Sequence, residues 1–280
     1  MKIELTGEQI KLQEEFKNFV DNVVAQYAAE NDAKEKVNEL VIEKIAKEGY
    51  LGSMIPAEFG GRGMDNITLG LLNQEFGRGC SSTKSLLTVH GMVALAILRW
   101  GTIQQKEYWL PRLAKGEVIG AFALTEPNVG SDAGSIECTA VLDGDSYIIN
   151  GTKKWTTMGQ IADLFLVFAR LDNKPTAFLV ERGVSGFSTR PINGLIGARA
   201  SMIAELSFEN CRIPESNILG KPGTGITHVA LASLDYGRYT IAWGCVGLGQ
   251  ACLDASLAYS RKRKQFGNAL RKNQLIQKVQ

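Results

Sequence analysis

The sequence has few of the residues that metal sites and disulfide frameworks need. Only two of its 280 residues are histidine, and its five cysteines include no Cys-x-x-Cys pair. An odd number of widely spaced cysteines is typical of reduced, buried thiols, and the shortage of histidine argues against a zinc site. We therefore expect no bound metal and no disulfides.

Charge of one sign is also missing, and so is a long apolar run. Lys and Arg number 31 against 29 Asp and Glu, a net charge of +2, which predicts no surface dedicated to nucleic acid. The first 16 residues carry four glutamates, unlike a secretory signal or a mitochondrial transit peptide. Without a run of 18 apolar residues, no membrane span is expected. These features predict a cytoplasmic protein with no nucleic-acid and no membrane partner.

The hydrophobic pattern divides the chain into three stretches, of which the first is helical. A chain of this length buries about 75% of its unfolded surface, so a large core is expected. From Thr6 to about Gly116 apolar residues recur at helical spacing. Thr6 with Gln9 resembles a capping box at the first helix. Later helices are expected over 67–78, 85–100 and 104–114.

From about Ile119 to Ile218 the pattern changes to short β-rich runs. The runs cover 140–142, 147–150, 164–169, 176–180, 187–190 and 204–208. Asp143-Gly144-Asp145 and Asn150-Gly151 are typical of the hairpin turns between such strands. Because no helices alternate with these runs, we expect a small antiparallel sheet and not a doubly wound parallel one.

The helical period returns in the last part of the chain, where helices are expected over 226–261 and 270–280. The predicted fold class is therefore α+β, with several domains: an N-terminal helical domain (1–118), a central antiparallel β domain (119–221) and the start of a C-terminal helical bundle (222–280). The last helix reaches Gln280 without a C-terminal capping signal, so the chain is expected to stop mid-helix.

Residues 120–135 carry the strongest chemical signal. Their sequence, GAFALTEPNVGSDAGS, begins as a strand and continues as a loop rich in Gly, Ser, Asp and Asn. The amides and hydroxyls of such a loop suit a phosphate or the polar edge of a ring. Taken alone, the segment is equally well explained as a strand followed by an ordinary surface loop.

Four motifs together resemble the acyl-CoA dehydrogenase flavoprotein family. They are YWLPRLAKGE at 108–117, ALTEPNVGSD at 123–132, GTKKWTT at 151–157 and RKQFG at 263–267. Their order and spacing are similar to that family from about residue 5 to the last residue. The resemblance implies an FAD-dependent enzyme that oxidises an acyl thioester by removing an α-proton and transferring the β-hydride to flavin N5.

The resemblance also implies which residues hold FAD. Thr125 would hydrogen-bond the pyrimidine edge of the flavin, Ser131 would reach the pyrophosphate or the substrate's pantetheine, and Trp155 would pack against the ring and exclude water. The alternative for Trp155 is a core position in the β domain. The complete expected cofactor set is Phe122, Leu124, Thr125, Gly130, Ser131, Trp155, Thr156, Thr157, Arg263, Phe266, Asn273 and Gln274.

The last four residues of this set match family positions that bind the FAD of a neighbouring subunit. Arg263 would meet the pyrophosphate through a charge-assisted hydrogen bond. The resemblance therefore implies a homodimer or a homotetramer. The alternative for this basic stretch, 261–264, is a solvated helix end.

Three residues match family positions that touch the acyl-thioester ligand: Ser131, Asp235 and Arg238. An Asp and an Arg three residues apart on a helix could equally form a surface ion pair. The family's glutamate base has no counterpart here, because the matching position on this helix is Gly237. The catalytic residue is therefore unknown, and the base is expected beyond Gln280.

Other ionisable residues are weaker candidates for catalysis. Glu126 has a structural role by the resemblance, and Glu75 is expected to be solvated or to cap a helix. His90 lies among apolar residues and is expected in the core or in a pocket wall, and His228 near a helix start is expected to be structural.

The implied partners are an acyl-CoA or acyl-carrier-protein thioester and an electron-transfer flavoprotein as electron acceptor. Residues 235–247 resemble dehydrogenases of polyketide extender-unit pathways, in which the acyl group rides on a carrier protein and the oxidised carbon can bear a hydroxyl. Two rival functions stay open. One is a non-catalytic flavin-binding or assembly homologue that lacks the base, and the other is a flavin oxidase or monooxygenase.

Overall fold

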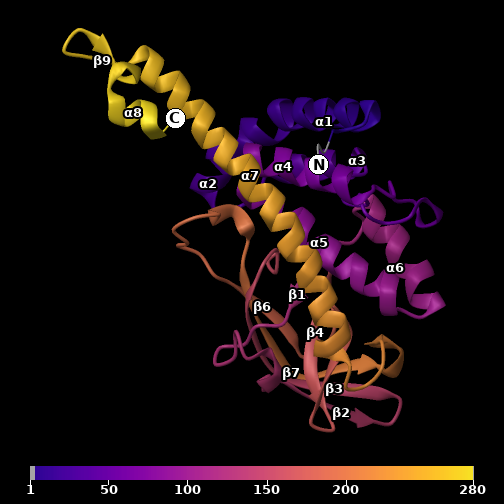
Figure 1. Cartoon of the computed structure of the whole chain (residues 1–280). Helices are drawn as coiled ribbons and strands as arrows, with labels where there is room; N and C mark the ends of the chain where they lie inside the picture. Colours follow the sequence, from indigo (N-terminus) through magenta and orange to yellow (C-terminus); the bar gives the residue numbers. More distant parts are fainter. Residues whose placement is uncertain (1–3, 280) are drawn as a thin grey trace.

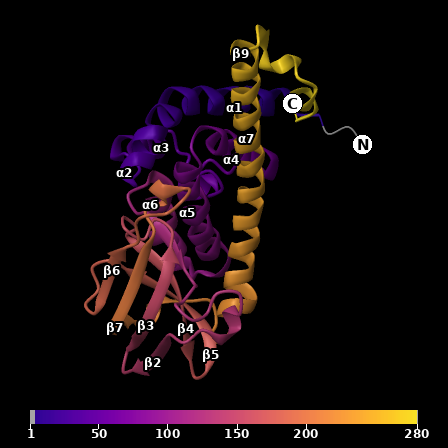
Figure 2. The same ribbon diagram turned by 90° about the vertical axis from the view of Figure 1, so that its left-hand side faces the viewer.

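The computed structural model describes residues 4–279, and one long helix runs past two other layers (Figures 1 and 2). Short helices from the N-terminal part pack beside one half of this long helix, and a β-sheet lies beside its other half. The N-terminal helices are α1 (Gly7–Phe19), α2 (Ala28–Lys34), α3 (Glu39–Lys47), α4 (Asn66–Gly79), α5 (Ser81–Trp100) and α6 (Ile103–Lys115). The predicted helical first stretch is confirmed.

Side-chain caps fix where several of these helices begin. Thr6 accepts a hydrogen bond from the backbone of Gln9, and the Gln9 side chain accepts one from the backbone of Thr6, so the predicted capping box is confirmed. Thr102 and Gln105 repeat this arrangement at α6. The Asp65 carboxylate caps α4. Such caps satisfy backbone amides that have no partner within the helix.

The central domain is a mixed sheet, so the expectation of a purely antiparallel one was wrong. Its strands are β1 (Gly120–Ala123), β2 (Thr139–Asp143), β3 (Ser146–Thr156), β4 (Leu164–Leu171), β5 (Lys174–Glu181), β6 (Phe187–Pro191), β7 (Ala204–Pro214) and β8 (Ile218–Leu219). The order is β6-β7-β3-β2-β4-β5-β8, with β1 beside β4. Strands β1 and β2 both pair with β4 in parallel. The sequence pattern could not reveal this, because strand direction depends on long-range pairing.

One of the two predicted hairpin turns was also wrong. Residues 143–145 do connect β2 to β3, with Gly144 at a positive φ of 65°. Asn150-Gly151, in contrast, lies inside β3, where the pairing with β7 shifts register. Gly151 has a φ of 137°, and a Cβ there would overlap the Sγ of Cys138. The glycine therefore marks a bulge and a close approach of two backbones, as isolated strand glycines often do.

Helix α5 lies between the helical layer and the sheet and supplies much of the core. Its residues belong to both apolar clusters of the molecule, one shared with α1 and α4 and the other with α6 and β4. Strand β4 is buried along nearly its whole length. The helical and β domains are thus held together by a continuous apolar interior.

The long helix α7 (Leu231–Lys262) follows a π-helical segment at Gly225–Ala230 and packs on α4 and α5. Glycines allow its close contact with α4, since a Cβ at Gly77 would overlap the backbone of Gly244. Beyond α7 the chain forms a small hairpin, β9 (Lys264–Gln265) and β10 (Asn268–Ala269), and a short α8 (Gln274–Val279). The helix predicted over 270–280 begins as a 3-10 turn at Leu270–Lys272 and becomes α-helical only at Gln274, and its last residue lies outside the described residues.

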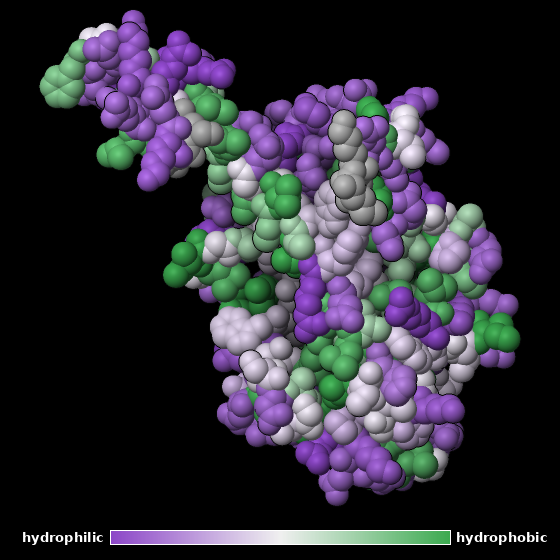
Figure 3. All heavy atoms as spheres, in the orientation of Figure 1, coloured by the Kyte–Doolittle hydropathy of each residue, from purple (hydrophilic) through white to green (hydrophobic). Residues whose placement is uncertain are grey.

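Two helices have the length and apolar composition of a membrane span, which the search for an uninterrupted apolar run missed. They are Ser81–Trp100 and Gly225–Lys262, each with a mean hydropathy of 1.2 over its best window. The window in α5 is 83% buried, and its place in the core accounts for its composition. The window in α7 is only 11% buried, and Figure 3 shows hydrophobic patches along this helix. The predicted lack of a membrane partner stays a prediction.

The cysteines are only partly as predicted. Within residues 4–279 all five are free, but Cys245 and Cys252 on α7 are exposed and not buried. Cys138 and Cys211 are buried in the β domain, where desolvation raises the thiol pKa to about 12 and about 11. These two thiols are therefore protonated at neutral pH.

Candidate active site

Two segments far apart in the sequence meet at one side of the β domain. The loop after β1 carries Thr125, and the end of β3 carries Trp155. The backbone N–H of Lys154 donates a hydrogen bond of 2.8 Å to the carbonyl oxygen of Thr125. The residues expected to contact the flavin from two motifs are therefore neighbours in space.

Hydroxyl groups without partners lie along this junction. Thr156 is buried, and its Oγ1 has no hydrogen-bond partner within residues 4–279. The hydroxyls of the half-buried Thr125 and Thr157 likewise have none among the described residues. A buried polar atom without a partner costs free energy, so such groups are usually satisfied by a ligand or by water. Thr156 Oγ1 is enclosed by the protein, so the hydroxyls that fit the polar edge of a flavin are those of Thr125 and Thr157.

Trp155 does not occupy the core position that was its alternative explanation. Its side chain is 50% exposed, and its backbone has a φ of 62° in the left-handed region. Strand β3 shifts register against β7 between Lys153 and Thr156, which turns Trp155 outward. A large residue in this backbone conformation is strained, and such strain is concentrated at functional sites.

The other cofactor residues expected in the β domain differ in their exposure. The Phe122 ring packs against Phe168 with 5.2 Å between centroids. The Leu124 side chain belongs to the apolar core, and its backbone carbonyl oxygen accepts a hydrogen bond from Lys153 Nζ. Gly130 and Ser131 are exposed, and a Cβ at Gly130 would meet no atom within 4 Å. The loop therefore offers free space around Ser131.

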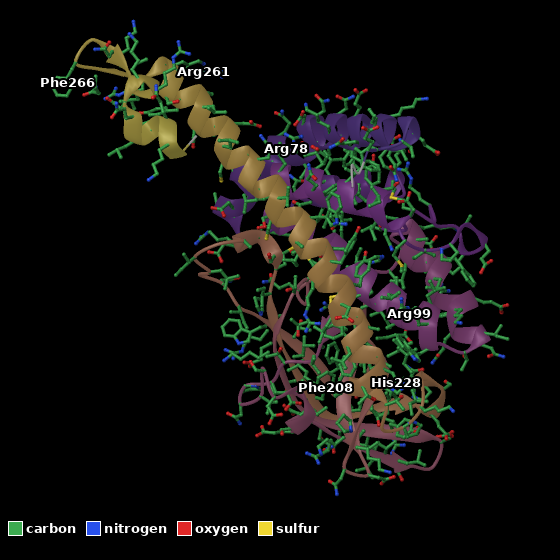
Figure 4. The ribbon with its side chains drawn as sticks, in the orientation of Figure 1. Arg78, Arg99, Phe208, His228, Arg261 and Phe266 are labelled. Atoms are coloured by element: carbon green, nitrogen blue, oxygen red, sulfur yellow. The ribbon has the colours of Figure 1, made fainter. Side chains whose placement is uncertain are left out.

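The C-terminal members of the predicted set lie far from this junction in the same chain. Figure 4 shows Phe266 at the tip of the segment that follows α7, beyond Arg261 and away from the sheet. Figure 3 shows this segment projecting from the body as a mostly hydrophilic knob. Helix α7 has 32 residues and is roughly 48 Å long. Arg263, Phe266, Asn273 and Gln274 are therefore not brought together with Thr125 and Trp155 within one chain.

The predicted substrate residues on α7 form an ion pair. Arg238 Nη1 lies 2.7 Å from Asp235 Oδ1, with side chains 66% and 76% exposed. Exposed pairs of this kind contribute about 1 kcal/mol or less, so both groups are free to exchange partners. Asp235 also lines a cavity of about 430 Å³ between α4, α5 and α7, whose wall includes Leu95, Arg99 and Tyr236. Ser131 lies in the β domain loop, on a different element.

The glutamates that were not nominated as the base are both committed to ion pairs. The Glu126 carboxylate lies 2.6 Å from Lys153 Nζ, and the Glu75 carboxylate lies 2.7 Å from Arg78 Nε. Glu75 is only 5% exposed, so its expected solvated role was wrong. Gly237 is buried against Met92 and carries no proton acceptor.

His90 is a core residue, one of the two placements expected for it. Its Nε2 lies 3.1 Å from the carbonyl oxygen of Leu113, and its Nδ1 accepts a hydrogen bond of 3.2 Å from the N–H of Gly120. These contacts require the neutral ring with the proton on Nε2. Burial lowers the pKa of His90 to about 4, against the smaller opposing effect of the Leu113 carbonyl.

The depressed pKa predicts an acid-sensitive fold. The unfolded histidine titrates near pH 6.5, so between pH 6.5 and 4 the unfolded state binds more protons than the folded state. The free energy of unfolding should therefore fall by about 2 kcal/mol between pH 7 and 5 from this group alone. Urea unfolding at both pH values should show this loss, and His90→Gln should lack it. His228→Gln, which changes an exposed histidine, should keep the wild-type pH dependence.

Sequence reasoning missed Lys153, which is fully buried beside the junction. A signal was present, because Lys153 shares the inward parity of β3 with the buried Tyr147 and Ile149. A lysine at an inward strand position needs a buried partner. No local pattern identified Glu126 as that partner, since it lies 27 residues earlier.

Comparisons with known proteins decide the family. Residues 6–117, 121–211 and 223–279 match the family models for the N-terminal, middle and C-terminal domains of acyl-CoA dehydrogenases. The chain belongs to the acyl-CoA dehydrogenase family. It is 38% identical to the short-chain specific acyl-CoA dehydrogenase of Clostridium acetobutylicum, an alignment that covers 98% of this chain and 74% of the relative.

Solved structures agree with this assignment. Butyryl-CoA dehydrogenase from Megasphaera elsdenii superimposes with a TM-score of 0.94 at 31% identity, over 99% of this chain and 75% of that one. A structure described as the electron transferring flavoprotein of Acidaminococcus fermentans contains a chain that matches with a TM-score of 0.96 at 35% identity, over 100% of this chain and 75% of that chain. The α+β fold class is thereby confirmed.

As an acyl-CoA dehydrogenase, the protein is an FAD-dependent oxidoreductase that oxidises acyl thioesters at a CH–CH bond. When bound, FAD supplies the acceptor for the hydride. The residues present fit this group: the hydroxyls of Thr125 and Thr157 would meet its polar edge, and the half-exposed ring of Trp155 would cover it and exclude water.

Proposed function

We propose that this chain oxidises a short-chain acyl-CoA, with FAD held at the junction of the β1 loop and the end of β3. The observation that supports the site most directly is the hydrogen bond from the N–H of Lys154 to the carbonyl oxygen of Thr125, which brings the half-buried Thr125 close to the outward-turned Trp155 and to Thr157. The short-chain preference is inferred from relatives, one named short-chain specific and one named butyryl-CoA dehydrogenase.

Within the β domain each proposed cofactor residue has a different role in binding FAD. The hydroxyls of Thr125 and Thr157 donate to the polar edge of the flavin, and the buried Thr156 between Trp155 and Thr157 holds the end of β3 in the domain. Trp155 covers the ring. The open backbone around Gly130 and Ser131 receives the pyrophosphate or the pantetheine arm. Phe122 and Leu124 support the strand from the core side.

A second subunit is part of this proposal. Arg263, Phe266, Asn273 and Gln274 lie too far along the chain to reach the flavin of their own β domain, as the placement of Phe266 in Figure 4 illustrates. In a homodimer or homotetramer they would bind the FAD of a neighbour. The guanidinium of Arg263 would then pair with the pyrophosphate.

For the substrate we propose that Asp235 and Arg238 meet the pantetheine arm together with Ser131. The same arm occurs in coenzyme A and in acyl carrier proteins, so these residues do not separate the two carriers. The electron acceptor proposed for the reduced flavin is an electron-transfer flavoprotein. One matching chain comes from a structure described as the electron transferring flavoprotein of Acidaminococcus fermentans, which supports this choice. A polyketide extender-unit substrate on a carrier protein stays the alternative.

The proton acceptor has no assigned residue within 4–279. Gly237 has no side chain, and Glu75 and Glu126 are both held in ion pairs. We keep the proposal that a glutamate beyond Gln280 serves as the base. A non-catalytic flavin-binding homologue is the rival, and it differs in one measurable respect: it binds FAD but does not reduce it.

The test begins with cofactor binding to the full chain. Titration with FAD should quench flavin fluorescence, because Trp155 contacts the ring. Trp155→Ala should weaken FAD binding by about tenfold or more, a cost of about 1.4 kcal/mol. Trp100→Ala, at a tryptophan outside the junction, is the matched control and should leave the affinity unchanged. A wild-type chain that does not bind FAD would contradict the proposed site.

Substrate reduction is tested separately. The FAD-loaded protein, extended past Gln280 so that it carries the proposed base, is mixed anaerobically with butyryl-CoA, longer acyl-CoAs and butyryl-acyl-carrier-protein, and the absorbance of the oxidised flavin is followed. Bleaching by butyryl-CoA supports the proposal, and bleaching only by the carrier-protein thioester favours the alternative. Bound flavin that no thioester reduces points to the non-catalytic homologue. Fast reoxidation by air would indicate an oxidase.

A further inference from the structure

The β domain contains an ion pair with almost no exposed surface. Lys153 Nζ on β3 lies 2.6 Å from Glu126 Oε1 in the loop after β1, and the two side chains are 0% and 1% exposed. Burying two charges is costly, and such a pair is often less stabilising than apolar residues of similar size. Its presence is therefore better explained by the geometry that it imposes than by stability alone.

The lysine pins the loop that carries Thr125. Besides Glu126, Lys153 Nζ donates a hydrogen bond of 3.1 Å to the carbonyl oxygen of Leu124. The next residue of β3, Lys154, donates from its backbone to the carbonyl oxygen of Thr125. Three consecutive loop residues are thus fixed to β3, and Thr125 is the middle one.

Glu126 ties the start of the same loop to its far end. Its carboxylate accepts hydrogen bonds from the backbone N–H groups of Glu137 and Cys138, the latter at 3.0 Å. These residues lie 11 and 12 positions further along, so the side chain bridges the base of the loop that contains Ser131. Burial alone would raise the pKa of Glu126, but Lys153 and the two amides outweigh it and hold that pKa below its usual value.

The pair also lies at the point where β3 becomes irregular. The regular pairing with β7 ends at Lys153 and resumes at Thr156, and the left-handed Trp155 lies between them. Anchoring Lys153 therefore fixes one side of the bulge that presents Trp155. Both walls of the proposed flavin site depend on one buried ammonium group.

We propose that the Lys153–Glu126 pair is a positioning device for the flavin, which sets the Thr125 loop and the Trp155 bulge at the spacing that FAD requires. Neither side chain contacts the flavin in this proposal. The inference rests on the proposed function, since it assumes that FAD binds at this junction. It assigns to Lys153 and Glu126 the orientation of the residues that bind the ring.

The test compares FAD dissociation constants for the full chain with those of Lys153→Met, Glu126→Gln and the double variant. Lys153→Met should weaken FAD binding at least about tenfold, and the flavin that is bound should show the absorbance spectrum of a more solvated ring. The double variant carries neither buried charge but still lacks the ammonium donor. It should recover stability relative to Lys153→Met and stay weak in FAD binding.

A second buried lysine provides the matched control. Lys84 on α5 is 2% exposed, lies over Gly244 of α7 and has no hydrogen-bond partner for Nζ among the described residues. Lys84→Met should leave the FAD dissociation constant unchanged. Added to Lys153→Met it should restore resistance to urea without restoring FAD affinity, and it provides a stabilised background should Lys153→Met alone not fold.

Two outcomes would overturn the positioning role. One is a Lys153→Met protein whose FAD affinity is within twofold of the wild type. The other is a Lys84→Met/Lys153→Met protein that regains wild-type affinity together with stability, since the pair would then act only through the fold. A wild-type chain that fails to bind FAD contradicts the proposed function instead, so the two failures are distinguishable.

Discussion

Gly247→Ala is expected to lower the free energy of unfolding by about 3 kcal/mol or more. Gly247 lies on α7 where this helix crosses α4. A Cβ at this position would overlap the carbonyl oxygen of Gln74 and come within 2.9 Å of the amide nitrogen of Arg78. Both atoms belong to the backbone of α4 and cannot rotate away. The methyl group can be accommodated only if the two helices separate, and urea unfolding measures the loss.

The control lies two residues further along the same helix. A Cβ at Gly249 would meet nothing within 4 Å, so Gly249→Ala should gain the ordinary helix propensity of alanine, about 0.5–1 kcal/mol. The two substitutions are chemically identical and should have opposite signs. Equal effects of the two on the free energy of unfolding would show that the contact between α4 and α7 is loose.

The sequence was sufficient for elements defined by local periodicity. The helical repeat of 67–78 and 85–100 predicts α4 and α5 to within a few residues, and the capping box at Thr6 fixes the start of α1. Alternating strand patterns likewise locate most of the sheet. These signals depend on neighbours in the chain, and such elements can be predicted without knowing the fold.

Features set by contacts between distant segments were not predictable in the same way. The parallel pairing of β1 with β4 is one example, and the placement of Gly151 against Cys138 is another. The motifs marked Thr125 and Trp155 as site residues, but the Lys154 hydrogen bond that joins them follows only from the fold. The separation of Arg263 from that junction likewise depends on the course of α7.

The two buried lysines, Lys153 and Lys84, differ in whether their ammonium groups have hydrogen-bond partners. The sequence alone does not reveal this difference. Lys153 lies between Glu126 and the carbonyl oxygen of Leu124, whereas Nζ of Lys84 has no partner within residues 4–279. Both side chains are almost fully removed from water. Buried lysine therefore has different effects in the two elements. In β3 its charge is paired and hydrogen-bonded, whereas in α5 the free-energy cost of burying it is not offset by a partner.

Lys84→Met is accordingly expected to raise the free energy of unfolding by about 2 to 3 kcal/mol at pH 7. Burial lowers the pKa of Lys84 to about 8, with a small opposing effect of the nearby Cys245. Methionine fills a similar volume over Gly244 and leaves no polar atom without a partner. Urea unfolding of the two proteins at pH 7 measures the gain.

The pH dependence identifies the cause of this gain. An unfolded lysine titrates near pH 10.4, so between about pH 8 and 10.4 the unfolded wild type binds more protons than the folded protein, and its stability should rise with pH from this group. Lys84→Met lacks the group and should lack the rise, so the two proteins should converge in stability as pH increases toward 10. A constant difference across this range would mean that methionine stabilises by packing alone. A less stable Lys84→Met protein would mean that the amine has a partner, such as an ordered water, whose bonds offset its burial.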